Sequence, residues 1–131
     1  MLNCRFCNKI PNEASISDLP VDVQQNIQKN NLKYFLCDCE TDWVEIDNDK
    51  ELFNLDLFGR KIRTLNDFKG LIDTLDSELS YYTAVPIIKD CLYRINDWLV
   101  SSDDIDASIE DSYIQNQIKI LIQVNNNYYT K

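Results

Sequence analysis

Apolar residues in the second half of the chain recur at every third or fourth position, which is the spacing of one face of an α-helix. Three such stripes follow one another along the chain. They comprise Leu65, Phe68, Ile72, Leu75 and Leu79; then Ile88, Cys91, Leu92, Ile95 and Leu99; then Ile105, Ile109, Ile118, Leu121 and Ile122. The pattern predicts three amphipathic helices that bury their apolar faces in a helical bundle.

The starts of these predicted helices carry local signals. The sequence Thr-Leu-Asn-Asp at 64–67 has the form of a capping box, with Asp in place of the usual Glu. Pro86 suits the first turn of the second helix, and Asp103 or Asp104 can cap the third. Residues 117–124 are rich enough in β-branched side chains to form a terminal strand instead, so both structures stay open there.

A shorter helix is expected in the first half of the chain. Ser17 or Asp18 can serve as its N-cap, and Pro20 then falls within the first turn, where its missing N–H does no harm. The apolar positions of this helix, at a spacing of four, are Leu19, Val23 and Ile27. The pattern predicts a helix that ends near 30–31.

Two stretches on either side of the second cysteine pair have the character of strands. Residues 32–36 are aromatic and apolar, and residues 43–47 alternate between apolar and acidic. Together they predict a β-hairpin. Residues 52–58 fit either a strand or a short helix, which Gly59 ends.

Four of the five cysteines form two close pairs, Cys4 with Cys7 and Cys37 with Cys39. The first pair resembles a zinc-ribbon knuckle over about six residues; Asn8 replaces the usual glycine and tolerates the same left-handed conformation. The second pair falls in the turn of the predicted hairpin. Two close pairs predict one zinc ion held by all four thiolates. Redox chemistry at the first pair is the alternative, although the chain lacks the βαβ pattern of thioredoxin-like motifs.

The predicted zinc site is structural rather than catalytic. Four thiolates fill a tetrahedral shell and leave no position for water or substrate. The chain contains no histidine that would supply another ligand or a proton shuttle. We expect the remaining cysteine, Cys91, to be a small core residue, because it lies in an apolar helical stripe.

With 131 residues, of which 44% are hydrophobic, the chain is long enough for one domain with its own core. We therefore expect a single domain over 1–131, with an α+β fold. A zinc-stapled N-terminal module of a short helix plus a β-hairpin, within 1–58, would pack on a three-helix C-terminal bundle within 59–131. No apolar run approaches the length of a membrane span, and the first residues do not resemble a signal peptide, so a cytoplasmic location is expected.

The net charge of −9 makes direct nucleic-acid binding unfavourable and favours a basic protein partner. Residues 38–56 hold eight acidic side chains and one basic side chain, Lys50. These acids could simply be a solvated edge that keeps sheets from associating. The functional interpretation is a partner-binding surface with an aromatic anchor. Its predicted residues are Asp38, Glu40, Asp42, Trp43, Glu45, Asp47 and Asp49.

An enzyme is not expected, because the chain has no histidine, no glycine-rich phosphate loop and no nucleophile elbow. In size, charge and compactness it is similar to small acidic inhibitors such as the immunity proteins that neutralise bacterial toxins. We therefore expect an acidic zinc-binding protein that binds and neutralises a basic protein, such as a nuclease toxin. The alternatives are a phage-encoded inhibitor that mimics DNA and a zinc-ribbon adaptor in a transcription or translation complex.

Overall fold

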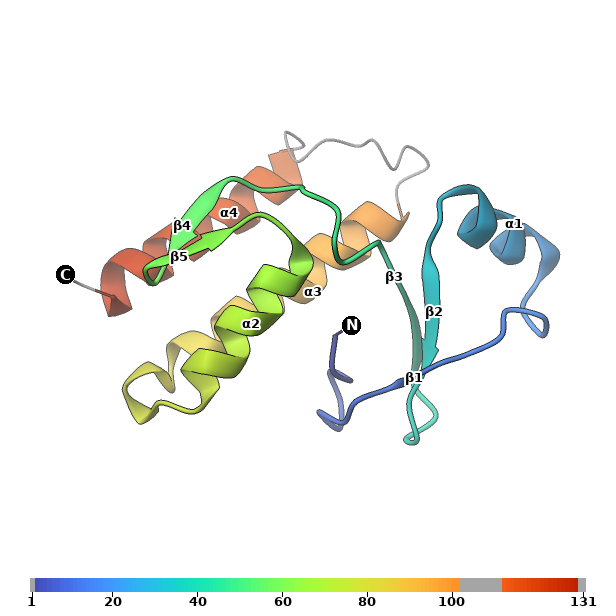
Figure 1. Ribbon diagram of the computed structural model, residues 1–131, viewed down its shortest axis with the longest axis horizontal. Coiled ribbons are helices and arrows are strands. Elements are labelled where there is room, and N and C mark those ends of the chain that lie inside the picture. Colours follow the sequence, from blue (N-terminus) through green and yellow to red (C-terminus); the bar gives the residue numbers. More distant parts are fainter. Residues whose placement is uncertain (1, 102–111, 130–131) are drawn as a thin grey trace. The chain divides into compact units, whose positions relative to one another are not determined.

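The computed structural model describes residues 2–101 and 112–129 (Figure 1). Within these ranges the fold mixes helix and sheet, with four α-helices and two small antiparallel sheets. The chain divides into two compact units, Met1–Asn48 and Asp49–Lys131, and each is described by itself. The single domain over 1–131 stays a prediction.

The first unit is built on a three-stranded antiparallel sheet with the order β1-β2-β3. Its strands are β1 (Asn12–Glu13), β2 (Lys33–Leu36) and β3 (Asp42–Glu45). Strands β2 and β3 form the predicted hairpin, and the second cysteine pair lies in the connection between them. Phe35 pairs with Trp43 across the hairpin, and their rings stack with centroids 6.2 Å apart.

Helix α1 (Val21–Lys29) confirms the predicted short helix but starts later than expected. Pro20 is itself the N-cap, and no side chain caps the helix, so the predicted caps Ser17 and Asp18 are wrong. The residue before a proline is disfavoured in the helical conformation, which prevents the helix from starting ahead of Pro20. Of the predicted apolar face, Ile27 is buried but Val23 is exposed.

The second unit begins with a hairpin formed by β4 (Leu55–Leu57) and β5 (Arg60–Ile62). Phe58 and Gly59 connect the strands, with φ angles of 53° and 74°. Two successive residues with positive φ form the tight turn that matches the twist of a hairpin. Of residues 52–58, for which strand and short helix both stayed open, Leu55–Leu57 form a strand and none is helical.

Helix α2 (Leu65–Asp76) starts with the predicted capping box. The Asp67 N–H donates to Thr64 Oγ1 over 3.2 Å, and the Thr64 N–H donates to Asp67 Oδ2 over 3.0 Å. The buried face of the helix consists of Leu65, Phe68, Leu71, Ile72 and Leu75. The predicted stripe is wrong at Leu79. This residue follows the end of α2, in the short turn η1 (Leu79–Tyr81), and is 91% exposed.

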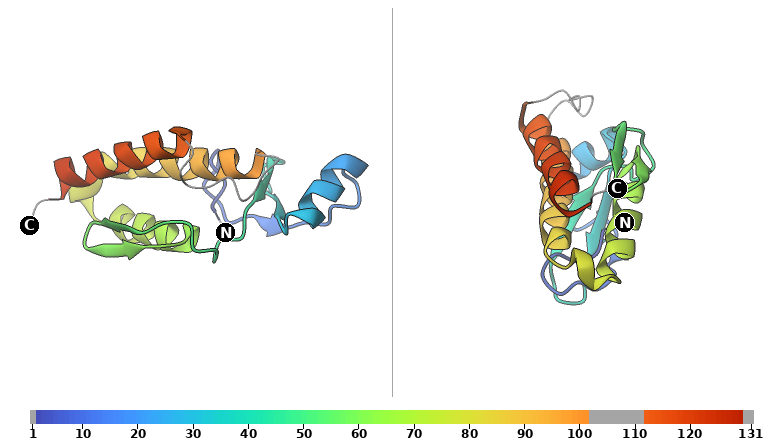
Figure 2. Two further views of the ribbon diagram at one scale, coloured as in Figure 1. Left: turned by 90° about the horizontal axis from the view of Figure 1, so that it is seen from above. Right: turned by 90° about the vertical axis from the view of Figure 1, so that its left-hand side faces the viewer.

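Helices α3 (Ala84–Ser101) and α4 (Ser112–Tyr128) complete the second unit. Helix α3 packs against both α2 and α4, and the hairpin β4-β5 packs against α2 and α4 (Figure 2). All five residues of the second predicted stripe are buried in α3. None of the described helices has the length and apolar character needed to cross a membrane.

Residues 117–124, for which helix and strand both stayed open, are helical and belong to α4. Ile118 and Leu121 are buried, whereas Ile122 is 43% exposed and does not belong to the buried face. The predicted caps Asp103 and Asp104, and the stripe residues Ile105 and Ile109, lie outside the described residues.

Candidate metal centre

The first cysteine pair lies in a tight turn closed by two backbone hydrogen bonds. The Asn8 N–H donates to the Cys4 carbonyl over 2.8 Å, and the Cys4 N–H donates to the Lys9 carbonyl over 2.9 Å. Asn8 has a φ of 60°, so it takes the left-handed conformation that glycine usually supplies in a knuckle. The turn thus folds Cys4 and Cys7 back toward each other.

The second pair lies in a turn of the same form that is one residue shorter. The Glu40 N–H donates to the Cys37 carbonyl over 2.9 Å, and the Cys37 N–H donates to the Thr41 carbonyl over 2.9 Å. Glu40 has a φ of 70° and takes the position that Asn8 has in the first turn. Nothing in the sequence indicated this left-handed residue, because glutamate has no special tolerance for positive φ.

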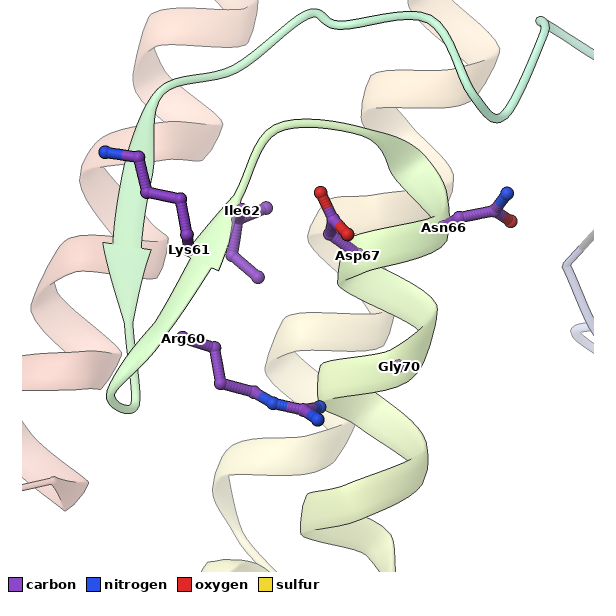
Figure 3. Close-up of a pocket in the computed structure, with 6 residues that line it drawn as sticks. All are labelled: Arg60, Lys61, Ile62, Asn66, Asp67 and Gly70. Atoms are coloured by element: carbon purple, nitrogen blue, oxygen red, sulfur yellow. The ribbon is translucent and has the colours of Figure 1, made fainter.

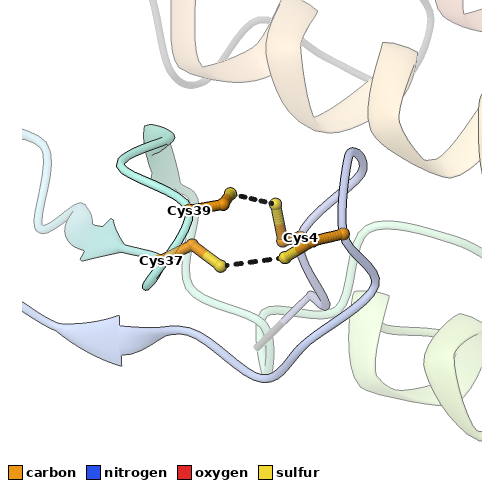
Figure 4. A group of neighbouring side chains, drawn as sticks. Cys4, Cys37 and Cys39 are labelled. Carbon is orange, nitrogen blue, oxygen red and sulfur yellow. Dashed lines mark hydrogen bonds between the residues drawn. The ribbon is translucent and has the colours of Figure 1, made fainter.

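These turns bring the four thiol groups together (Figure 4). The Sγ atoms of Cys4 and Cys39 are 3.6 Å apart, those of Cys7 and Cys37 are 3.2 Å apart, and all four lie within 4.8 Å of one another. With Zn–S bonds of about 2.3 Å, the sulfurs of a tetrahedral site are separated by roughly 3.8 Å. The cluster therefore has dimensions that suit one metal ion, and all four cysteines are free thiols.

The cluster can offer a metal a complete set of ligands. Cys4 and Cys37 are buried, Cys7 is half-buried and Cys39 is exposed. Four sulfur ligands in a tetrahedral arrangement are typical of zinc or iron sites, and such a shell has no open position for a reacting molecule. The arrangement can hold an ion and tie the two turns together.

The hydrogen bonds around the cluster favour thiolates at two positions. The Cys39 Sγ lies 3.2 Å from the Thr41 hydroxyl, and hydrogen bonding with this hydroxyl and with the Thr41 N–H lowers the pKa of Cys39 to about 6. Burial opposes ionisation of Cys4, but hydrogen bonds from the N–H groups of Cys7 and Phe6 outweigh the effect of burial. The pKa of the Cys4 thiol is therefore lowered. Thiolates are the form that binds metal.

Cys37 behaves differently. The Cys39 N–H favours its thiolate, but the neighbouring Cys7 thiol and burial together outweigh this and raise the pKa of Cys37 to about 12. A divalent cation at the centre of the cluster would reverse the balance, because metal binding displaces the thiol proton.

The fifth cysteine lies in the second unit. Cys91 is buried in α3, and burial raises the pKa of its thiol to about 11. It is a core residue, as its place in the apolar stripe predicted. Among the described residues, the group able to hold a metal consists of the other four cysteines.

Glu45 was predicted to belong to the partner-binding surface, but the structure places it inside the first unit with 0% exposure. Its carboxylate accepts hydrogen bonds from the Leu2 N–H, over 3.0 and 3.2 Å, and from Trp43 Nε1 over 2.7 Å. Asn48 Nδ2 donates to it over 2.9 Å. A buried carboxylate needs such donors, and one that is enclosed by them does not face a partner.

The other predicted surface residues have different environments. Asp38, Glu40, Asp42 and Asp47 are exposed in the first unit, and Asp49 is exposed in the second. Trp43 is half-buried.

One of these acids has a hydrogen-bond partner on the neighbouring strand. The Tyr34 hydroxyl donates to the Asp42 carboxylate, and this bond raises the pKa of Tyr34 to about 12. Asp42 is therefore exposed and at the same time oriented by the sheet.

A hollow of about 370 Å³ in the second unit lies between β5 and the start of α2 (Figure 3). Its lining residues are Arg60, Lys61, Ile62, Asn66, Asp67 and Gly70. Arg60 Nη1 donates to Thr74 Oγ1 over 2.9 Å, and the Asp67 carboxylate belongs to the capping box. Arg60 thus links the hairpin to α2, and Asp67 caps the start of the helix.

Comparison of the chain with protein-family models, with curated proteins and with solved structures finds no match in any of the three. The fold and the site define a mixed α/β chain with a four-cysteine cluster that can hold a metal ion.

Proposed function

We propose that this chain is a small acidic protein that is stapled by one structural zinc ion and binds a basic protein partner. The observation that carries the proposal is the meeting of four thiols, from two turns of the same form, within 4.8 Å. Zinc is the proposed ion because it favours tetrahedral thiolate sites and needs no redox partner.

The proposed role of the ion is to hold the first unit together. It joins residues 4–7 to residues 37–39, and the segment between them contains β1, α1 and β2. Zinc binding contributes on the order of 10–16 kcal/mol in small zinc-finger peptides, comparable with the ~5–15 kcal/mol stability of a whole domain. A unit of this size gains a large part of its stability from such an ion.

The acidic residues next to the second turn support the choice of a basic partner. The first unit contains eight acidic and four basic side chains, and Asp38, Glu40 and Asp42 are exposed beside the proposed ion. Close like charges repel one another, and a basic surface relieves this repulsion while steering the encounter. The partner that we propose is a basic nuclease. The chain would neutralise it as immunity proteins neutralise their toxins.

Metal analysis of the purified, reduced protein tests the proposed zinc site. We expect one zinc per chain by mass spectrometry, retained in Cys91→Ser and lost in Cys4→Ser, because only the latter removes a ligand. Iron in place of zinc, or a folded first unit without metal, would contradict the proposal.

Binding to the partner recovered by co-purification tests the acidic surface. The variant Asp38→Asn/Glu40→Gln/Asp42→Asn removes three exposed charges beside the second turn. Its matched control, which removes three exposed charges from the second unit, is Asp73→Asn/Asp76→Asn/Glu78→Gln. We expect the first variant to weaken binding by about tenfold or more and to flatten its salt dependence, whereas the control leaves both unchanged. Equal effects of the two variants would rule out a local docking surface.

One observation favours a second candidate function, a zinc-ribbon adaptor that contacts nucleic acid. Phe6, at the tip of the first turn, is 77% exposed, and Arg5 and Lys9 are exposed on the same turn. Exposed aromatic rings stack on bases, and basic side chains contact phosphates. If the protein is retained on heparin and Phe6→Ala is not, the nucleic-acid adaptor is favoured over a protein that binds a basic partner.

A further inference from the structure

The four thiols of the cluster are unequally accessible. Cys39 is exposed, Cys7 is half-buried, and Cys4 and Cys37 are buried with exposed fractions of 1% and 3%. Small oxidants in solution therefore reach Cys39 first. Accessible thiolates are oxidised in preference to buried ones, and coordination to a metal keeps a cysteine in its thiolate form.

Two close sulfur pairs run between the two turns. Cys39 Sγ is 3.6 Å from Cys4 Sγ (Figure 4). Cys37 Sγ is 3.2 Å from Cys7 Sγ. A disulfide needs a separation of about 2.05 Å, so a shift of roughly 1.5 Å would join Cys39 to Cys4. A cysteine of the other turn thus lies within reach of the exposed thiol.

We propose that Cys39 is an oxidation site and that Cys4 is its resolving partner, so that a peroxide replaces the metal staple with a disulfide between the two turns. The release of metal in this inference rests on the proposed zinc site. The disulfide connectivity rests only on the exposure and positions of the thiols.

The chemistry needs one peroxide and no other reactant. The Cys39 thiolate attacks the peroxide, the O–O bond breaks, an S–OH group forms and hydroxide leaves. The Cys4 thiolate then attacks this sulfur, an S–S bond forms, the S–O bond breaks and a second hydroxide leaves. Two electrons pass from the two thiolates to the peroxide, and the ion loses two of its four ligands.

The product keeps the two turns connected. A bond from Cys4 to Cys39 spans the same segment that the ion closes, so the first unit stays cross-linked after the metal leaves. Cys7 and Cys37, whose Sγ atoms are 3.2 Å apart, are then left as free thiols. A dithiol reductant reverses the change: one of its thiolates attacks the disulfide, the S–S bond breaks, the reductant leaves as its own disulfide, and zinc can again bind all four thiolates.

The test treats the reduced protein with hydrogen peroxide after its metal content has been measured. A chromogenic indicator follows released metal, and peptide mass spectrometry without reduction identifies the disulfides. We expect the bond from Cys4 to Cys39 to be the first product and to form in parallel with metal release, with Cys91 still reduced. A first bond within one turn, or sulfinic acid at Cys39 without a disulfide, would overturn the proposal.

Two controls keep the result interpretable. Cys91→Ser, which removes the buried thiol of the second unit, is expected to leave the rate of metal release unchanged. Alkylation of the unmodified protein is expected to label Cys39 at least about tenfold faster than Cys91, which tests accessibility without any variant; equal rates would contradict the proposal. A protein without metal would contradict the proposed function, yet its disulfide map would still decide this inference.

Discussion

Glu45 lies within an acidic run but is enclosed by its own unit. Four neighbouring residues of the sequence, Asp42, Asp47, Asp49 and Glu51, are exposed acids, whereas the Glu45 side chain has 0% exposure. Three donors, on Leu2, Trp43 and Asn48, bind its carboxylate. The carboxylate thereby links the start of the chain to the end of β3, so we expect Glu45 to matter for stability.

Glu45→Gln is expected to destabilise the first unit by about 2 kcal/mol, because an amide nitrogen replaces an acceptor oxygen and leaves a buried donor without a partner. Urea denaturation followed by Trp43 fluorescence, in a Trp98→Phe background, measures this change. The control is Asp47→Asn on the exposed neighbour, with an expected change within about 0.5 kcal/mol. Similar losses in the two variants would show that charge rather than burial matters here.

At the scale of elements, the start of α2 depends on one carboxylate. Asp67 Oδ2 accepts from the N–H groups of Arg63 and Thr64 over 2.9 and 3.0 Å. The bond from Arg63 has the largest effect on the pKa of Asp67. Together the two bonds outweigh the effect of burial and hold this pKa below its ordinary value of 3.8. The ionised carboxylate therefore stabilises the folded second unit.

This contribution is expected to be pH-dependent. It is fully present above the pKa of the unfolded chain, 3.8, and is lost as the pH falls through the lower pKa of the folded state. Asp67→Asn is expected to cost about 1 kcal/mol at pH 7 and progressively less below pH 4. Denaturation followed by circular dichroism at several pH values measures the difference, and Asp73→Asn, exposed on the same helix, is the control. A difference that stays constant down to pH 2 would contradict the assignment.

Helix α4 offers a direct test of its buried face, because two adjacent residues differ in exposure. Leu121 is buried, and Ile122 is exposed. Leu121→Ala is expected to destabilise the second unit by about 2–5 kcal/mol, because it leaves a cavity, whereas Ile122→Ala should change stability by about 0.5 kcal/mol or less. Thermal or urea denaturation compares them. A larger loss for Ile122→Ala would mean that the helix is rotated about its axis.

At the scale of the whole chain, the two units differ in how they are held together. The second unit has a core of side chains from three helices and a hairpin, with Phe68, Ile88, Ile95, Ile114 and Leu121 among its buried residues. The first unit has a small three-stranded sheet, one short helix and the cysteine cluster. We therefore expect metal to matter for the first unit and not for the second.

Removal of metal by a strong chelator is expected to unfold the first unit selectively. Trp43 emission should shift to longer wavelength, measured in the Trp98→Phe background, because its contact with Phe35 is lost. Most of the helical circular dichroism should remain, because α2, α3 and α4 belong to the second unit. Addition of zinc should restore the emission, and loss of all helical signal would show that the units unfold together.

The sequence determined those features that depend on neighbouring residues. Helical periodicity predicted α2, α3 and the helical face of α4 at Ile118 and Leu121, and the capping box predicted where α2 starts. The spacing of cysteine pairs predicted which four thiols come together, and asparagine predicted the left-handed position of the first turn. Local sterics and hydrogen bonding decide these features, so they can be derived from short stretches of chain.

Only the tertiary structure decided what depends on residues far apart in the sequence. It placed Glu45 inside, where Leu2 supplies a donor from the start of the chain, and it left Leu79 and Ile122 exposed on segments with apolar periodicity. It also showed that Cys39 is the most exposed thiol of the cluster and that its Sγ lies 3.6 Å from that of Cys4. Burial and side-chain proximity result from long-range packing, which residue type and spacing do not specify.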